Sequence, residues 1–163
     1  MLSVAKSFLI LCFAFTAASC GFKLRGAQAL PFGSIYLGVA PNSPLAAQLA
    51  RNIRAGSATR VVPQPQGADA VLEILDEARD REIIAVNAQG RAREYLLRLR
   101  LTFRVHDGKG REFIAPTQLV AQRDISFNEE QILAKEAEET LLYRDMQGDL
   151  VQQILRRLAS VQT

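Results

Sequence analysis

The chain has 163 residues, of which 48% are hydrophobic, and a formal net charge of +3 at pH 7. This length and composition are typical of one globular domain, and so mild a positive charge does not indicate nucleic-acid binding. Two cysteines and one histidine, His106, are too few for a zinc site built from cysteines or clustered histidines.

The first 19 residues have the organisation of a secretory signal. Lys6 supplies a positive charge, residues 8–18 are almost entirely apolar, and small residues follow as far as Ser19. The apolar run is about 11 residues long, whereas a membrane-spanning helix needs roughly 20. We therefore predict a signal peptide over residues 1–19 and not a transmembrane anchor.

Cys20 directly follows three small residues, and the sequence AASC resembles a bacterial lipobox. In a lipobox, cleavage makes the cysteine the first residue of the mature chain, and the cysteine is acylated. Several acyl chains anchor a protein stably, whereas one binds only marginally. The residue after an acylated cysteine influences sorting. Here it is Gly21 and not an aspartate, which resembles lipoproteins that are sorted to the outer membrane. We predict lipidation at Cys20; the alternative is an ordinary secreted protein in which this cysteine has no such role.

Residues 20–33 contain several glycines and a proline, and we predict a lipidated tether there, followed by a single domain over residues 34–163. The domain begins with a predicted strand at 34–39. A helix is expected next, with Ser43 as its N-cap and Pro44 in its first position. Its expected apolar stripe and C-terminal stop are Leu45, Leu49, Ile53 and Gly56.

Three further strands are predicted at about residues 71–86, 91–106 and 111–126. The sequence DGKG at 107–110 is a strong hairpin signal, and Pro116 indicates an edge strand or a bulge. The central strand shows strict alternation of apolar and polar residues. Its predicted core face consists of Tyr95, Leu97, Leu99, Leu101, Phe103 and Val105.

A long helix is predicted from Asn128, which forms a capping box with Gln131. Apolar residues recur about every four positions, and Gly148 predicts a kink. These apolar residues are Leu133, Ala137, Leu141, Met146, Leu150, Ile154 and Leu158. The order strand, helix, three strands, helix predicts an α+β, two-layer sandwich. Its sheet is expected to be mixed and roughly four-stranded, with both helices packed on one face.

The chain carries no motif of an enzyme active site. It has no G-x-S-x-G nucleophile elbow and no phosphate-binding glycine-rich loop. His106 adjoins the predicted hairpin and reads as an exposed turn residue. The acidic residues of the last helix are typical of a solvated helix face. We therefore predict a non-enzymatic protein without a cofactor.

Arginines line the polar face of the central strand. Two cross-strand ion pairs are expected there, Arg100 with Glu77 and Arg104 with Glu73, and such pairs contribute roughly 0.2 to 1 kcal/mol. The alternative is a basic ladder that binds an acidic ligand.

A second set of basic residues is expected at one edge of the sheet. The start of the central strand, the end of the last strand and the first turns of the long helix all meet there, at the positive end of the helix dipole. We call this set the basic corner: Arg91, Arg93, Arg123 and Lys135. It is a candidate anion-binding site. The alternative is ordinary ion pairing, Arg123 with Glu94 and Lys135 with Glu139.

Three stretches resemble the LptE family of lipopolysaccharide-assembly lipoproteins. They are CGFKLRG at 20–26, REYLLRLRLTFRV at 93–105 and QILAKEAEE at 131–139. The resemblance implies a lipoprotein that plugs LptD, an outer-membrane β-barrel, assists its assembly and binds lipopolysaccharide. Lys135 matches a family lysine implicated in that binding. The family has a second basic residue implicated in that binding, just before the central strand. Its position falls on Ala88 in this chain, and Arg91 or Arg93 would substitute for it.

The resemblance therefore places the protein in the outer membrane, anchored by lipid, facing the periplasm and inserted in the barrel lumen. Its partners would be LptD and lipopolysaccharide, without nucleic acid. A different function remains open from the residues alone. A pilotin-like envelope lipoprotein would chaperone another outer-membrane assembly and bind no lipid ligand.

Overall fold

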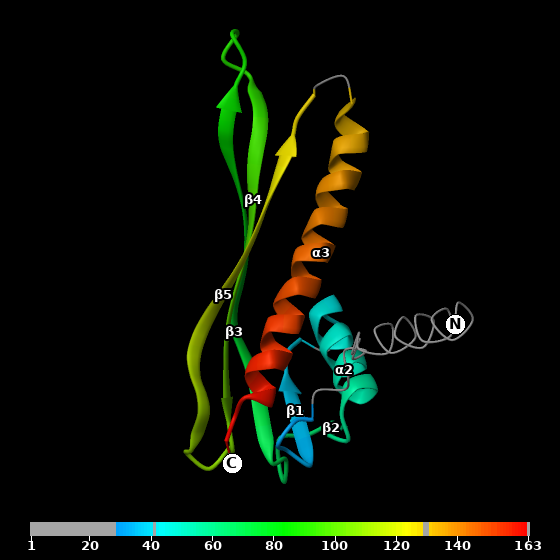
Figure 1. Cartoon of the computed structure of the whole chain (residues 1–163), viewed down its shortest axis with the longest axis vertical. Coiled ribbons are helices and arrows are strands. Elements are labelled where there is room, and N and C mark those ends of the chain that lie inside the picture. Colours follow the sequence, from blue (N-terminus) through cyan, green and yellow to red (C-terminus); the bar gives the residue numbers. More distant parts are fainter. Residues whose placement is uncertain (1–28, 41, 129–130, 163) are drawn as a thin grey trace, which may run out of the picture.

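The computed structural model describes residues 29–40, 42–128 and 131–162 (Figure 1). The predicted signal peptide and Cys20 lie outside these residues. The elements in chain order are β1 (Ser34–Gly38), α2 (Pro44–Gly56), β2 (Arg60–Val62), β3 (Ala70–Val86), β4 (Ala92–His106), β5 (Glu112–Ser126) and α3 (Ile132–Ala159).

The sheet has five strands in the order β2-β1-β3-β4-β5. β1 is parallel to both β2 and β3, whereas β3, β4 and β5 form an antiparallel meander. The predicted α+β class and mixed sheet are confirmed. The expected four strands become five because β2, only three residues long, adds to the sheet beside β1.

The alternation in β4 builds the core. Leu97, Leu99, Leu101, Phe103 and Val105 are buried, while the residues between them are only half-buried. Because successive side chains of a strand point to opposite faces, the leucine-rich face lies under the helices. Tyr95 is half-buried and packs at the margin of the same core.

Both helices contribute to that single core (Figure 1). α2 begins as expected, with the Ser43 hydroxyl accepting the Leu45 N–H and Pro44 in the first turn. Its apolar stripe is buried and consists of Leu45, Leu49 and Ile53. The core also includes Phe32, which contacts Phe113 with 5.1 Å between ring centroids, so packing begins before β1.

α3 differs from the prediction in three respects. It begins at Ile132 and not at Asn128, and its N-cap residue, Gln131, makes no side-chain capping hydrogen bond. The helix is continuous through Gly148, where a kink was expected; the absence of a Cβ there leaves room for Gln48 of α2. Its predicted apolar stripe is buried only in the C-terminal half, at Met146, Leu150, Ile154 and Leu158.

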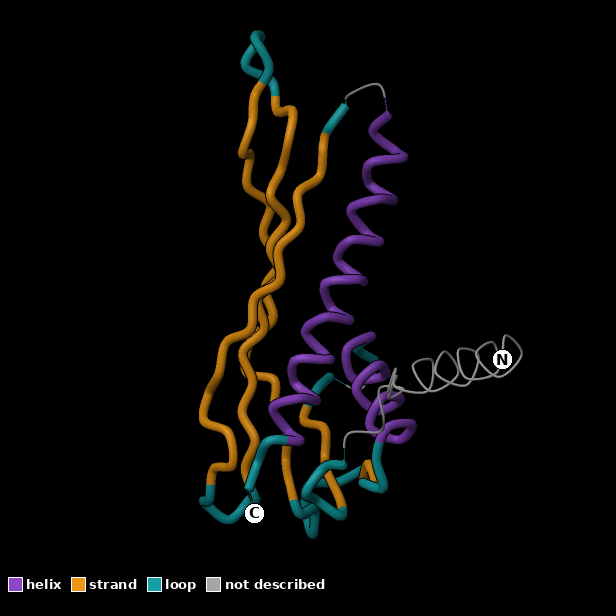
Figure 2. Tube along the Cα trace, viewed as in Figure 1, coloured by secondary structure: helices purple, strands orange, loops and turns teal. Residues whose placement is uncertain are grey.

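The N-terminal half of α3 leaves its apolar side chains exposed. Leu133 is 82% exposed and Leu141 56%. Figure 2 shows the three long strands winding about one another beside this helix. The core lies around the C-terminal half of α3, where α2 also packs, and the first turns of α3 extend past it.

The two turns of the meander contain glycines, and one of its irregularities lies beside a proline. Gly90, Gly108 and Gly110 have positive φ angles in the turns at 87–90 and 107–110, where a residue without Cβ is favoured. Pro116 lies in an edge strand beside a register shift, as predicted. The ladder of β3 and β4 is irregular around Leu75 and Ile84.

Candidate functional site

Lys135 lies in the first turns of α3, against the end of β5. Its Nζ donates to Ser126 Oγ at 3.1 Å and forms an ion pair with Glu138 at 2.8 Å. The expected pairing with Glu139 is wrong, because Glu139 instead accepts from Arg81 at 3.2 Å. Only 15% of the Lys135 side chain is exposed, so the ammonium group is held in a fixed position.

Arg93 reaches the same end of the sheet through backbone pairing. Phe127 donates its N–H to the Arg93 carbonyl at 2.7 Å, and Ser126 lies opposite Glu94. Arg91 ends the adjoining turn, where its N–H donates to Asn87 Oδ1 at 2.9 Å. The structure therefore brings Arg91, Arg93 and Lys135 to one end of the molecule.

Arg123 does not join them. It lies opposite Leu97 and not Glu94, and its guanidinium forms an ion pair with Asp149 in the middle of α3. The expected pairing of Arg123 with Glu94 is wrong, because Glu94 is level with Ser126, three residues farther along β5. The basic corner thus has three members at one end of the molecule and a fourth that is turned toward the middle of α3.

Aromatic and aliphatic side chains lie at the same end of the molecule as these three cations. Tyr95 and Phe127 pack edge to face with 5.4 Å between ring centroids, and the Arg81 guanidinium lies 4.6 Å from the Tyr95 centroid. Exposed aliphatic residues continue this surface. They are Ile83, Ile84, Val86, Ile132 and Leu133, with exposed fractions from 45% to 82%.

This end therefore combines cations with apolar surface, the two features that an amphipathic anion such as a phosphorylated lipid requires. Sequence reasoning missed the contribution of β3. The only indication in the sequence is that Ile83, Ile84 and Val86 lie close together beside the turn and do not alternate with polar residues.

The outer face of the sheet carries neutralised charge. Arg104 pairs with Glu73 at 2.6 Å, as predicted. Arg100 pairs with Asp80 at 2.8 Å and not with Glu77, because the irregularity at Leu75 shifts β3 by one residue. The arginines of β4 thus form a ladder of ion pairs, which makes this face a weak candidate for binding an acidic ligand.

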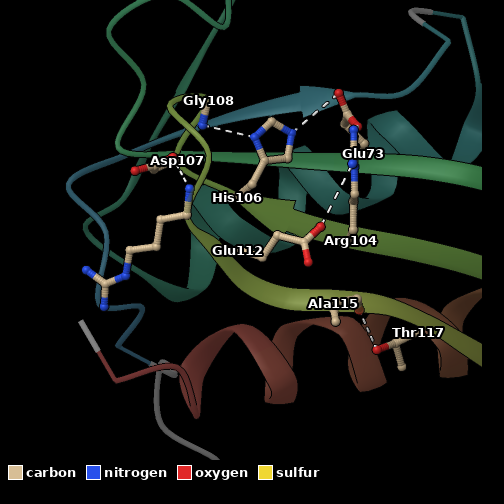
Figure 3. A network of polar contacts seen from close by, with 9 residues as sticks. Glu73, Arg104, His106, Asp107, Gly108, Glu112, Ala115 and Thr117 are labelled. Atoms are coloured by element: carbon tan, nitrogen blue, oxygen red, sulfur yellow. Dashed lines mark hydrogen bonds and ion pairs between the residues drawn. The ribbon is translucent and has the colours of Figure 1, made fainter.

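His106 belongs to a polar cluster at the opposite end of the sheet (Figure 3). Its Nδ1 accepts the Gly108 N–H at 2.9 Å, and its Nε2 lies 3.4 Å from Glu73 Oε1. Only 18% of the side chain is exposed, so the expected exposed turn residue is instead packed against β3. The hydrogen bond from Arg104 holds the pKa of Glu73 below its usual value, and His106 adds to this effect.

In the part of the chain that the structure describes, no helix is both long and apolar enough to span a membrane.

A family model described as "LptE: Lipopolysaccharide-assembly" matches residues 32–158. Similar proteins include the LPS-assembly lipoprotein LptE of Photorhabdus laumondii, 27% identical over 148 residues, covering 88% of this chain and 79% of the relative. The protein of the same name from Yersinia pestis (strain Pestoides F) is 30% identical over 151 residues, covering 88% and 70%.

Solved structures share the fold. An uncharacterized lipoprotein B from Nitrosomonas europaea has a TM-score of 0.73 and 34% identity, covering 86% of this chain and 91% of that one. The rare lipoprotein B from Shewanella oneidensis, with a TM-score of 0.68 and 21% identity, covers 78% and 94% and supports the fold alone. The family match spans both helices and the whole meander. The chain therefore belongs to the LptE family of lipopolysaccharide-assembly lipoproteins.

Proposed function

We propose that this protein binds lipopolysaccharide at the end of the sheet that carries Arg91, Arg93 and Lys135, and that it plugs and helps assemble an LptD-like barrel. Family membership supports a role in lipopolysaccharide transport. In this proposal the protein is a non-enzymatic subunit anchored in the outer membrane through an acylated Cys20 and inserted in the barrel lumen.

The observation that carries the binding proposal is the position of Lys135. Its ammonium group is fixed between Ser126 and Glu138, next to exposed aliphatic residues of the first turn of α3. Lipid A presents phosphates beside acyl chains, so a fixed cation at the border of an apolar surface suits both parts. Charge-assisted hydrogen bonds to phosphate are about twice as strong as neutral ones.

The clustered cations differ in what they can contribute. Arg91 and Arg93 are exposed and flank the turn, whereas Lys135 is largely covered. Arg123 lies opposite Leu97 and pairs with Asp149 in the middle of α3, away from that end, so we expect it to contribute less to ligand binding than the other three.

Charge reversal tests the site. The triple variant Lys135→Glu, Arg91→Glu, Arg93→Glu should bind purified lipopolysaccharide at least about tenfold more weakly, a loss of about 1.4 kcal/mol. Binding is measured with the full-length protein in detergent, and the thermal unfolding midpoint shows whether the fold is retained.

A matched control carries the same charge change elsewhere. Lys109 lies in the hairpin at the opposite end, and Arg51 and Arg54 are exposed on α2. The variant Lys109→Glu, Arg51→Glu, Arg54→Glu should keep nearly full binding. Equal losses of lipopolysaccharide binding in both triple variants would show that net charge, and not this site, causes the effect. Undiminished binding in the first variant would show that the ligand does not bind at this site.

A further inference from the structure

β3 is much longer than the strand that pairs with it on one side. β1 pairs only with Ala70–Glu73, whereas β3 continues to Val86. Among the residues that the structure describes, no strand pairs with the rest of that side. From Asp76 to Ile83 the ladder with β4 is regular, and irregularities at Leu75 and Ile84 bound it. We call residues 76–83, on the side away from β4, the open edge.

Backbone pairing shows which residues face the open edge. The bond from Phe127 N–H to the Arg93 carbonyl continues the β4–β5 register. Antiparallel partners alternate between residues that exchange hydrogen bonds and residues that do not. Odd-numbered residues of β4 therefore bond to β5, and even-numbered ones bond to β3. The partners of the latter in β3 are Ala78, Asp80 and Glu82. The backbone groups that face the open edge consequently belong to Glu77, Arg79, Arg81 and Ile83.

Two clefts follow the open edge in succession. The first, of about 350 Å³, lies where β1 leaves the sheet, between residues 38–40 with Ser43 and residues 74–77. The second, of about 540 Å³, lies between residues 79–81 and the helix residues Glu136, Glu139, Thr140 and Tyr143. A neighbouring strand lies about 4.8 Å away in the plane of the sheet. A strand added at the open edge would continue the line of β1 and direct alternate side chains into the second cleft.

The charges along the edge define the partner strand. Arg79 and Arg81 face the helix side, where they lie over Tyr143 and Tyr95 respectively. Asp80 and Glu82 face the outer side, paired with arginines of β4. Opposite charges across strands are favourable and like charges are destabilising. The best partner therefore carries acidic or aromatic side chains toward the helix, whereas the outer side, where Asp80 and Glu82 are already paired, does not select a charge.

A second copy of this chain fits poorly. Twofold antiparallel pairing of two open edges can be centred on any residue from Ala78 to Glu82. Centring on Arg79 or Arg81 places that arginine opposite its own copy, and centring on Asp80 or Glu82 does the same for that carboxylate. Centring on Ala78 places Asp76 opposite Asp80. Each arrangement sets like charges directly opposite, which is destabilising.

We propose that the open edge of β3 accepts an extended segment of the barrel partner as an added strand, held chiefly by the backbone groups of Glu77, Arg79, Arg81 and Ile83. This inference rests on the proposed function, because that function supplies the partner. Strand addition draws its affinity from main-chain hydrogen bonds and its specificity from pockets for alternate side chains. The edge and the two clefts supply both.

Amide hydrogen exchange tests the proposal directly on the full-length protein. Exchange is compared between the free protein and the complex purified from its native membrane. Peptides covering residues 76–84 should exchange at least about tenfold more slowly in the complex. Peptides covering residues 117–124 of β5, the other long edge, are the internal control and should change far less.

A pair of substitutions isolates the backbone donor. Arg79→Ala and Arg79→Pro both remove the side chain, but only proline removes the N–H, and proline is tolerated at strand edges. Recovery of the barrel with tagged protein should fall at least about tenfold with Arg79→Pro and less than about twofold with Arg79→Ala. Far-UV circular dichroism checks the fold, and the exchange measurement decides the matter if the proline variant unfolds.

The outcomes separate the two proposals. If the wild-type protein recovers the barrel but residues 76–84 exchange as fast in the complex as in the free protein, strand addition is wrong and the proposed function stands. Equal losses from Arg79→Ala and Arg79→Pro would also refute strand addition, because they would implicate the side chain. Failure of the wild-type protein to recover any barrel would overturn the proposed function, and this inference with it.

Discussion

At the end of the sheet away from the basic corner, one carboxylate serves two neighbours. Glu73 accepts from Arg104 Nε at 2.7 Å and lies 3.4 Å from His106 Nε2 (Figure 3). The Arg104 hydrogen bond is the main reason why the pKa of Glu73 lies below its ordinary value of 4.5. A lowered pKa in the folded state means that the carboxylate stabilises the fold above pH 4.5, and that this contribution is lost as the pH falls through the folded-state pKa.

Replacing Glu73 should therefore have a pH-dependent effect. We expect Glu73→Gln to lower the free energy of unfolding by about 0.2–1 kcal/mol at pH 7, because both side chains of the pair are about one-third exposed. At pH values below the folded-state pKa the variant and the wild type should be nearly equal. Urea unfolding at both pH values measures the difference. Glu112→Gln is the control, since Glu112 lies 3.9 Å from Arg104 and should matter less. A constant difference at all pH values would contradict this account.

The pairing of these side chains could be predicted only in part. Arg104 lies opposite Glu73 as predicted, although the ladder beside the turn, with Val86 opposite Ala92, is one residue away from that register. Arg100 lies opposite Ala78 and pairs with Asp80, because the irregularity at Leu75 shifts residues 76–83 by one position relative to Glu73. A bulge of this kind depends on local backbone geometry and leaves no mark in the pattern of hydrophobic residues.

At the scale of elements, α3 has two halves with different roles. Its C-terminal half buries Met146, Leu150 and Ile154 completely, whereas Leu133 and Leu141 in the N-terminal half are largely exposed. The same four-residue spacing runs through both halves, so periodicity alone indicated a fully packed helix. An exposed apolar half is typical of a surface that another molecule covers.

Two matched substitutions in this helix test the division. Leu150→Ala should lower the free energy of unfolding by about 2–5 kcal/mol, because it leaves a cavity in the core. Leu133→Ala should change it by less than about 0.5 kcal/mol, as for exposed positions in general. Thermal or urea unfolding of the purified variants gives both values. Similar losses in the two variants would show that the N-terminal half is packed in the isolated protein.

Other elements could be predicted where their own residues specify the local structure. The alternation in β4, the glycines of the two hairpins and the Ser43-Pro44 pair each specify local structure, and all three are observed. β2 was missed because a three-residue strand shows no periodicity. The start of α3 was misplaced because its N-cap residue, Gln131, makes no side-chain capping bond.

At the scale of the whole molecule, the two ends have different chemistry. The hairpin at 107–110 and the C-terminus lie at one end, while the turn at 87–90 and the start of α3 lie at the other (Figure 1). The second end gathers Arg91, Arg93 and Lys135 with exposed aliphatic residues, and the open edge of β3 leads toward it. Sequence reasoning located the cations of this end, but only the fold shows the apolar surface beside them and the position of Arg123.

We propose that this domain works inside a complex with an outer-membrane barrel. Detergent extraction of tagged full-length protein from its native membrane, followed by identification of co-purifying proteins by mass, tests it most directly. We expect a large β-barrel protein in equal amounts with the tagged chain. Purification of the chain alone, or with a component of a secretion or pilus system, would contradict it.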